Sequence, residues 1–176
     1  VIPGGVRKID KHAFYGCENL TTITMKNGLE TIGDYAFDSC RELVSIDIPD
    51  SVTSIGVWVF HGCSELKKAS LSRNITKIEK ATFRACQKLE SVILSPAVTD
   101  IADDAFKYCN AYVYYPAVLG DISDKVTGQC AYTIQKDNTV AVHVEQGSRS
   151  LEILESIYGM PISSLTFAEG VNPIVI

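Results

Sequence analysis

Cysteine returns at a fixed interval through much of this chain. It falls at positions 17, 40, 63, 86 and 109, each 23 residues after the one before. Phenylalanine keeps the same interval at 14, 37, 60, 83 and 106, and isoleucine keeps it at 9, 32, 55, 78 and 101. A period of this length indicates supersecondary units that cannot bury their apolar sides alone and therefore stack. The sequence predicts a solenoid.

Each unit carries three recognisable segments. The first is Leu-x-x-Ile-x-Ile, whose last two apolar positions alternate as in a half-buried strand. A turn residue follows, such as Gly28, Ser51 or Asn74, and then Val-x-x-Ile and Ala-Phe-x-x-Cys. The last segment has room for a tight turn or a single helical turn. We therefore expect one parallel β-strand in each coil, strands roughly 4.8 Å apart, and short turns or single-turn helices on the convex side.

Residues 32–43 read I-G-D-Y-A-F-D-S-C-R-E-L, and residues 55–66 depart from this pattern only at Val59. The pattern I-G-x-x-A-F-x-x-C-x-x-L resembles the BspA-type leucine-rich repeat family of bacterial and protist surface proteins. The fourth unit is looser, because Glu79 replaces the glycine and Thr82 the alanine. The resemblance implies a leucine-rich repeat solenoid in a cell-surface or secreted protein that adheres to host proteins or other cells.

The regular pattern ends near residue 109. The spacing from Pro116 to Cys130 equals that from Pro49 to Cys63, so we expect Cys130 to belong to a degraded sixth unit and the array to span residues 1–135. Residues 136–161 are predicted to form an interruption or cap, with a hairpin turning at 136–138 and a short helix over 150–159. Residues 162–176 repeat the spacing of 20–32, which indicates the start of a further partial repeat. The predicted C-terminal segment is thus irregular α+β.

The composition of the chain argues against several classes of binding partner. A net charge of −5 without a basic stripe argues against nucleic acid, and no apolar run approaches the ~18 residues of a membrane span, so we expect no membrane insertion in this fragment. The chain opens on Val1-Ile2-Pro3, which resembles the end of a strand and indicates a fragment of a longer protein. There is no H-E-x-x-H or C-x-x-C motif, and we expect neither a metal nor a cofactor.

The cysteines and the one candidate catalytic group can be explained without any chemical activity. Adjacent coils could bring cysteines within disulfide distance, but equivalent thiols in register offer no unique pairing, and buried reduced thiols are favoured. Cys130, His143 and Asp137 have the residue types of a nucleophile, a base and an orienting group. No elbow or oxyanion loop surrounds them, so we expect the protein not to be an enzyme.

Two surfaces are candidate binding sites. The column before Ala-Phe holds His12, Tyr35, Trp58, Ala81 and Asp104, and its rings would stand side by side, joined by Tyr15 and His61. An exposed Trp with aromatic neighbours is a common anchor for protein or sugar partners, although such rings can also simply cover the convex backbone. Tyr35, Trp58 and His61 are the candidates here.

The strand face opposite the core is the second candidate. Its predicted members are small hydroxyl-bearing and charged residues: Thr22, Thr24, Lys26, Ser45, Asp47, Lys68, Ser70, Ser72, Ser91, Ile93 and Ser95. From these, Thr22, Thr24, Asp47, Lys68, Ser70, Ser91 and Ile93 are the candidate binding residues. A plain solvated sheet is an equal alternative, since the face has no aromatic anchor.

We therefore expect a non-catalytic interaction module for an unidentified protein or glycan ligand on another cell or matrix, located extracellularly or at the cell surface. The alternative is a structural stalk that presents another domain and has no ligand of its own.

Overall fold

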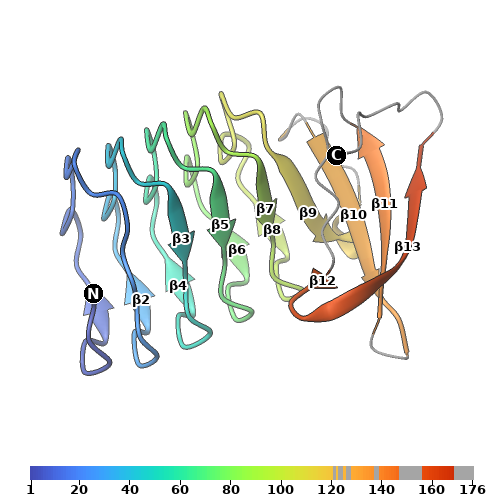
Figure 1. Ribbon diagram of the computed structural model, residues 1–176, viewed down its shortest axis with the longest axis horizontal. Coiled ribbons are helices and arrows are strands. Elements are labelled where there is room, and N and C mark those ends of the chain that lie inside the picture. Colours follow the sequence, from blue (N-terminus) through green and yellow to red (C-terminus); the bar gives the residue numbers. More distant parts are fainter. Residues whose placement is uncertain (121, 123–124, 126–127, 137–138, 147–155, 169–176) are drawn as a thin grey trace.

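The protein is described by a computed structural model that covers residues 1–120, 122, 125, 128–136, 139–146 and 156–168. Coils follow one another along the long axis, from the first coil at one end to strands β10–β13 at the other (Figure 1). The predicted solenoid of parallel strands is confirmed.

One row of strands holds the predicted strand of each coil. β3 (Ser45–Asp47), β5 (Lys68–Ser70), β7 (Ser91–Ile93) and β9 (Tyr112–Pro116) pair in parallel. Ile46, Ala69, Val92 and Val113 lie opposite one another in this register, so the column seen in the sequence is a row of neighbours in space. Thr22 extends the row by an isolated bridge to Ser45.

A second row, which the sequence analysis did not predict, comes from the Val-x-x-Ile segments. Its two-residue strands are β1 (Lys8–Ile9), β2 (Thr31–Ile32), β4 (Ser54–Ile55), β6 (Lys77–Ile78) and β8 (Asp100–Ile101). β1, β2 and β4 form one parallel sheet, and β6 and β8 form another. In each strand the isoleucine is buried and its neighbour faces outward, so each strand has one core residue.

The convex Ala-Phe-x-x-Cys segments are turns, not helical turns. In the second coil, alternate backbone N–H groups donate to the next coil, from Tyr35 to Val57, Phe37 to Val59 and Ser39 to His61, at 2.8–3.0 Å. The N–H groups between them donate to the carbonyl three residues back. In a helix all of these N–H groups would donate within one coil. Here every second one donates to the neighbouring coil, so the segment forms stacked turns and no helix. Among the described residues the only helical element is the 3-10 helix η1 (Ala117–Leu119).

The solenoid core lies between the two rows. The phenylalanine rings stack on one another, with centroids of neighbouring rings 5.0–5.6 Å apart. Phe37, Phe60 and Phe83 are fully buried, and each such ring contributes roughly 1.5–3 kcal/mol by burial. The leucine, isoleucine and cysteine columns complete the same cluster. The periodic residues are thus chiefly core residues.

A second apolar core lies on the opposite face of the sheet. β9 is buried along its whole length, because Val113 and Tyr115 face the solenoid core while Tyr112 and Tyr114 face the second one. The second core also contains Cys130, Tyr132, Val140, Val142, Val144 and Ile157. The sheet therefore has its apolar side on one face at β3–β7 and on the other face at β11–β13.

This change of face coincides with a reversal of strand direction. β10 (Gly128–Ile134) runs parallel to β9, β11 (Val140–Gln146) runs antiparallel to β10, and β13 (Met160–Phe167) runs parallel to β11. The predicted hairpin is thus confirmed as two antiparallel strands, although Asp137 and Asn138 of its turn lie outside the described residues. Val142 lies opposite Leu165 and Val144 opposite Phe167, again 23 residues apart.

Two predictions about the C-terminal segment are wrong. Cys130 does not occupy the cysteine position of a sixth unit, because it lies within β10 opposite Tyr114. Ser156–Ile157, expected in a helix, form strand β12 and pair with β13 across a tight turn at Tyr158 and Gly159, both with positive φ (52° and 76°). The rest of the predicted helix, residues 150–155, lies outside the described residues. The boundaries at 135 and 161 stay predictions, and one eight-stranded sheet runs across both.

Candidate functional site

The cysteine ladder belongs to the core. All six cysteines are free thiols; Cys17 is exposed and the other five are buried. The Cys40 Sγ donates to the Phe14 carbonyl at 3.2 Å, and Cys63 and Cys86 repeat this bond to Phe37 and Phe60. Burial raises the pKa of the Cys40 thiol to about 12, and it raises the pKa of Cys63 and Cys86 as well. Such thiols are poor nucleophiles at neutral pH.

Cys130 and His143, two members of the candidate catalytic group, are not brought together. Cys130 faces the second core, where it is fully buried. His143 lies opposite Ala131, the next residue of β10, so its side chain is on the other face of the sheet. Its Nδ1 lies 2.7 Å from Thr166 Oγ1. Asp137 lies outside the described residues.

The predicted ring column does form a continuous surface, which we call the aromatic strip: His12, Tyr15, Tyr35, Trp58 and His61. The Tyr35 ring lies 5.0 Å from His12 and 6.0 Å from Trp58, centroid to centroid. Tyr15 meets His12 edge-on at 5.5 Å, and His61 meets Trp58 edge-on at 4.7 Å. His12 and Tyr15 are exposed, whereas Tyr35, Trp58 and His61 are half-buried.

The backbone holds these rings in an uncommon conformation. His12, Tyr35 and Trp58 have φ values of 61°, 56° and 60°, in the left-handed region that bulky residues rarely adopt. Hydrogen bonds from each of their N–H groups to the next coil, at 2.9–3.0 Å, maintain it. Since Ala81 takes the same conformation in the following coil, the geometry comes from the stacking and not from the rings.

Residues that the sequence analysis did not single out complete the strip. The Arg84 guanidinium lies over the Trp58 ring at 5.6 Å and over the Tyr108 ring at 5.1 Å. Trp58 therefore has Tyr35 from the preceding coil and Arg84 from the following coil as neighbours. The signal was present in the sequence, because Tyr15, Asp38, His61, Arg84 and Lys107 form a column three residues after the ring column.

A buried carboxylate supports His61. Asp38 is 6% exposed, and its Oδ1 lies 3.0 Å from His61 Nδ1 and accepts a hydrogen bond from Ser39 Oγ at 2.8 Å. These contacts fix the imidazole against Trp58. The strip is consequently held by ring contacts, hydrogen bonds and backbone together, which reduces the side-chain entropy that a ligand would have to remove.

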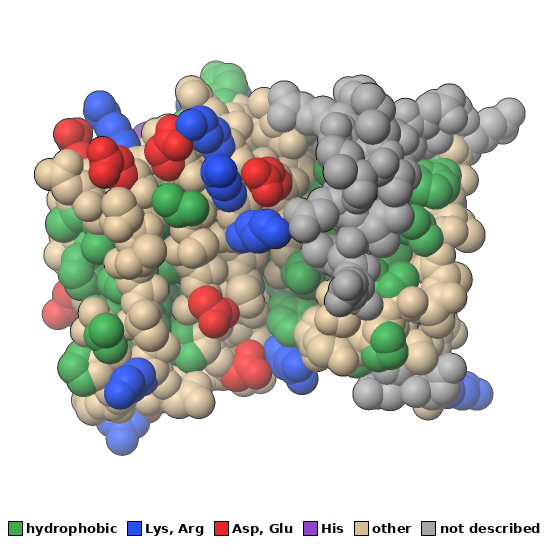
Figure 2. All heavy atoms as spheres, viewed as in Figure 1, with side chains coloured by type: hydrophobic (Ala, Val, Ile, Leu, Met, Phe, Trp, Pro, Cys, Tyr) green, Lys and Arg blue, Asp and Glu red, His purple; other side chains and the backbone are tan. Residues whose placement is uncertain are grey.

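The open face of the sheet is only partly as predicted. Thr22, Thr24, Asp47, Lys68 and Ser70 are exposed. Figure 2 shows much of this side in the colour of backbone and uncharged polar side chains, with some hydrophobic groups between them and with acidic and basic groups toward both the upper and the lower edge.

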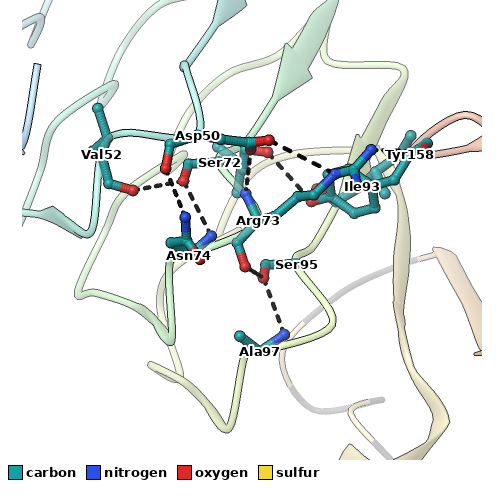
Figure 3. A network of polar contacts seen from close by, with 10 residues as sticks. Asp50, Val52, Ser72, Arg73, Asn74, Ile93, Ser95, Ala97 and Tyr158 are labelled. Carbon is teal, nitrogen blue, oxygen red and sulfur yellow. Dashed lines mark hydrogen bonds and ion pairs between the residues drawn. The ribbon is translucent and has the colours of Figure 1, made fainter. Parts of the chain in front are cut away.

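Lys26 and Ser45 are exposed as well, but the four other predicted members of that face are not on an open surface. Ser91 and Ile93 are half-buried, and Ile93 packs against the second core. Ser72 and Ser95 are wholly buried, which corrects their placement on the open face. Ser72 Oγ donates to the Val52 carbonyl at 2.5 Å and accepts from the Asn74 N–H at 3.1 Å, so it holds a corner of the coil (Figure 3).

The hairpin β12–β13 borders the open face. Arg73 Nη2 donates to the Tyr158 carbonyl at 2.7 Å, and its guanidinium lies over the Tyr158 ring at 5.1 Å (Figure 3). Asp50 Oδ1 accepts from the Arg73 N–H at 2.8 Å, and Tyr158 Oη donates to the Leu71 carbonyl at 3.3 Å. These contacts join the C-terminal hairpin to the third and fourth coils.

Within the described ranges, no group of three or more His, Cys, Asp or Glu side chains is arranged to hold a metal ion. No helix of the described chain is long and apolar enough to cross a membrane.

Solved structures with a similar fold include leucine-rich repeat proteins. A leucine-rich repeat protein from T. pallidum (TpLRR) is 32% identical over 61% of this chain and 51% of its own, with a TM-score of 0.58. A leucine-rich repeat protein from Bacteroides ovatus is 21% identical over 99% of this chain and 55% of its own, with a TM-score of 0.61. The pneumococcal vaccine antigen PcpA is 24% identical over 99% of this chain and 46% of its own, with a TM-score of 0.58.

The chain thus spans about half the length of these solved structures. No curated protein matches it. The BspA type leucine rich repeat region matches residues 1–112 in six copies. Because that match covers more than half of the sequence, the chain belongs to the BspA-type leucine-rich repeat family.

Proposed function

We propose that this chain is a non-catalytic protein-interaction module of a larger secreted or cell-surface protein, and that the aromatic strip is its binding surface. One observation carries the proposal: Trp58, Tyr35 and Arg84 are contiguous, held in place and partly open to solvent. Trp, Tyr and Arg are the residue types that most often dominate protein–protein binding energy. Membership of a leucine-rich repeat family supports a role in binding and not in catalysis.

A protein ligand is favoured over a glycan by the orientation of the rings. A sugar stacks on the face of an aromatic ring, but Tyr35 lies between His12 and Trp58, and Trp58 lies between Tyr35 and Arg84. The two largest rings therefore present edges to solvent. Edges together with guanidinium and imidazole donors suit the mixed polar and apolar surface of a protein.

The family resemblance supports a surface location and a role in adhesion to host proteins or other cells. The structural stalk stays the second candidate, and a specific observation favours it. The rings pack on one another and over the backbone of the corner, as side chains that only cover the solenoid would.

The test is a binding screen of this chain against immobilised extracellular-matrix and host-surface proteins, with a glycan array in parallel. We expect binding to a protein, and we expect Trp58→Ala to weaken it by about 30-fold, the usual effect of losing a hot spot. Asp47→Ala, an exposed change on the open sheet face, is the matched control and should bind like wild type. Circular dichroism shows that both variants fold.

Three results would contradict the proposal. Equal binding by wild type and Trp58→Ala would remove the strip as the binding surface. Binding to glycans alone would make the ligand class wrong, and binding to neither class would support the stalk.

A further inference from the structure

We infer that the aromatic strip recognises an acidic segment of its protein partner, in which aspartate or glutamate side chains meet Arg84 and the neighbouring lysines. This inference rests on the proposed function and specifies the chemistry of the partner. It comes from how the charged groups around the strip are oriented.

Three carboxylates beside the aromatic strip are bonded to groups of the protein itself. Asp34 Oδ1 accepts from the Val57 N–H at 3.1 Å, and Asp104 Oδ1 accepts from the Ala81 N–H at 3.1 Å. Asp38 is buried beneath His61. These three anions accept from backbone and imidazole groups of neighbouring coils and are half-buried or buried, so less of their charge is open to a ligand than that of an exposed carboxylate.

The cations of the same coils face outward. Lys11, Lys80 and Lys107 are exposed, and the Lys11 and Lys107 ammonium groups lie over the Tyr35 and Tyr108 rings at 5.6 and 5.4 Å. At the two ends of the strip the exposed acids Asp10 and Asp103 pair with Lys8 and Lys125. A positive surface consequently lies within a chain whose net charge is −5.

Arg84 is the group best placed to receive a carboxylate. Trp58 and Tyr108 flank its guanidinium, and its contact with Asp104 is loose, with 3.7 Å between Nη1 and Oδ2. The two rings restrict the position of the guanidinium, and a guanidinium can bind a carboxylate through two parallel hydrogen bonds. The aromatic edges beside it carry partial positive charge and add to the attraction.

The experiment uses a synthetic Asp/Glu-rich peptide containing tyrosine, and a control peptide with Gln and Asn in place of the acids. Trp58, the single tryptophan, reports binding by fluorescence. We expect the acidic peptide to bind, the neutral peptide to bind at least about tenfold more weakly, and the affinity to fall roughly threefold or more between 50 and 300 mM NaCl. Arg84→Gln should weaken the acidic peptide about tenfold or more, as expected for a charge-assisted contact.

Lys26→Gln is the matched control, because it removes one exposed positive charge from another part of the surface. It should leave binding unchanged, whereas equal loss in Lys26→Gln and Arg84→Gln would show nonspecific attraction and overturn the inference. Equal binding of the two peptides would overturn it too, as would binding of a heparin fragment without binding of the peptide. If a protein from the screen binds through Trp58 but ignores salt and Arg84→Gln, this inference fails while the proposed function stands.

Discussion

Two glycines of the third coil, Gly56 and Gly62, are required for different physical reasons, and substitution by alanine separates those reasons. At Gly56 the neighbouring coil approaches closely. A Cβ there would lie 2.3 Å from Asp34 Oδ1 and 2.6 Å from the Asp34 backbone nitrogen. At Gly62 the nearest atom to a Cβ, Ser39 Oγ, is 3.6 Å away, but φ is +68°. Gly56 is thus constrained by space and Gly62 by backbone conformation.

Gly56→Ala should lower the free energy of unfolding by about 1–3 kcal/mol, the usual cost of forcing an extra carbon into a packed site. The Asp34 backbone nitrogen and Cα, which a Cβ would meet at 2.6 and 2.9 Å, cannot move aside as a flexible side chain can. The clash also displaces the Asp34 carboxylate from the Val57 N–H, a 3.1 Å hydrogen bond. Since this corner carries Trp58, the substitution should change the tryptophan fluorescence of the folded state as well.

Gly62→Ala should cost less. The left-handed conformation costs an L-residue about 1–2 kcal/mol, and the loss of unfolded-state entropy returns about 0.4–1 kcal/mol. A net loss of about 0.5–1 kcal/mol follows. The reverse substitution exists in the next coil, where Ala85 occupies the same column with φ 61°. Ala85→Gly should therefore stabilise the protein by a similar amount.

Urea unfolding, followed by circular dichroism and Trp58 fluorescence, measures all three variants. The expected order of stability is Ala85→Gly, wild type, Gly62→Ala and Gly56→Ala, from highest to lowest. If Ala85→Gly destabilises as much as Gly62→Ala does, the left-handed corner carries no cost in this fold. If Gly56→Ala is neutral, the close approach of the coils is wrong.

Further predictions concern other parts of the structure. At pH 8 a disulfide reagent should modify Cys17 quickly and Cys40 slowly, because burial raises the Cys40 pKa to about 12; a fast second thiol would contradict the buried ladder. Ser72→Ala leaves the buried Val52 carbonyl and the part-buried Asn74 N–H without their partner and should cost about 1–3 kcal/mol in urea unfolding; a neutral result would mean water replaces the hydroxyl. Arg73→Ala removes the contacts to Tyr158 and should speed amide hydrogen exchange at 156–162, while unchanged exchange there would show that the hairpin is held by the second core alone.

Much of the array could be predicted because each column of the sequence has one physical role. Phe37, for example, stacks on its own copies Phe14 and Phe60 in the adjacent coils, so periodicity alone identifies it as core. The ring column was predicted for the same reason. What periodicity does not convey is conformation: the positive φ of Trp58 depends on the hydrogen bond from its N–H to the next coil.

The C-terminal part was predicted less well, although signals for it exist. Tyr112 and Tyr114 stand where the earlier coils have Ser, Lys or Asp and, in the coil just before, Ile93, which is the mark of a strand buried on both sides. Val142 and Leu165 keep the 23-residue interval across the segment taken as an interruption. Two strands are too few to establish a repeat, and the β10–β11 hairpin reverses the chain. The interval alone therefore did not predict that β11 and β13 pair.

The two opposed cores bear on which surface is open to a ligand. Because the second core and the Tyr158 hairpin occupy the sheet face from Ile93 onward, the open face is reduced to the first strands of the row. The corner that carries the aromatic strip is unaffected, since the rings of Tyr35 and Trp58 project from turns outside both cores. From His12 to Tyr108 it presents ring and guanidinium groups over five successive coils without interruption by the hairpin. In many solenoids the extended sheet is the natural binding face. In this chain the reversal of the sheet favours the corner instead.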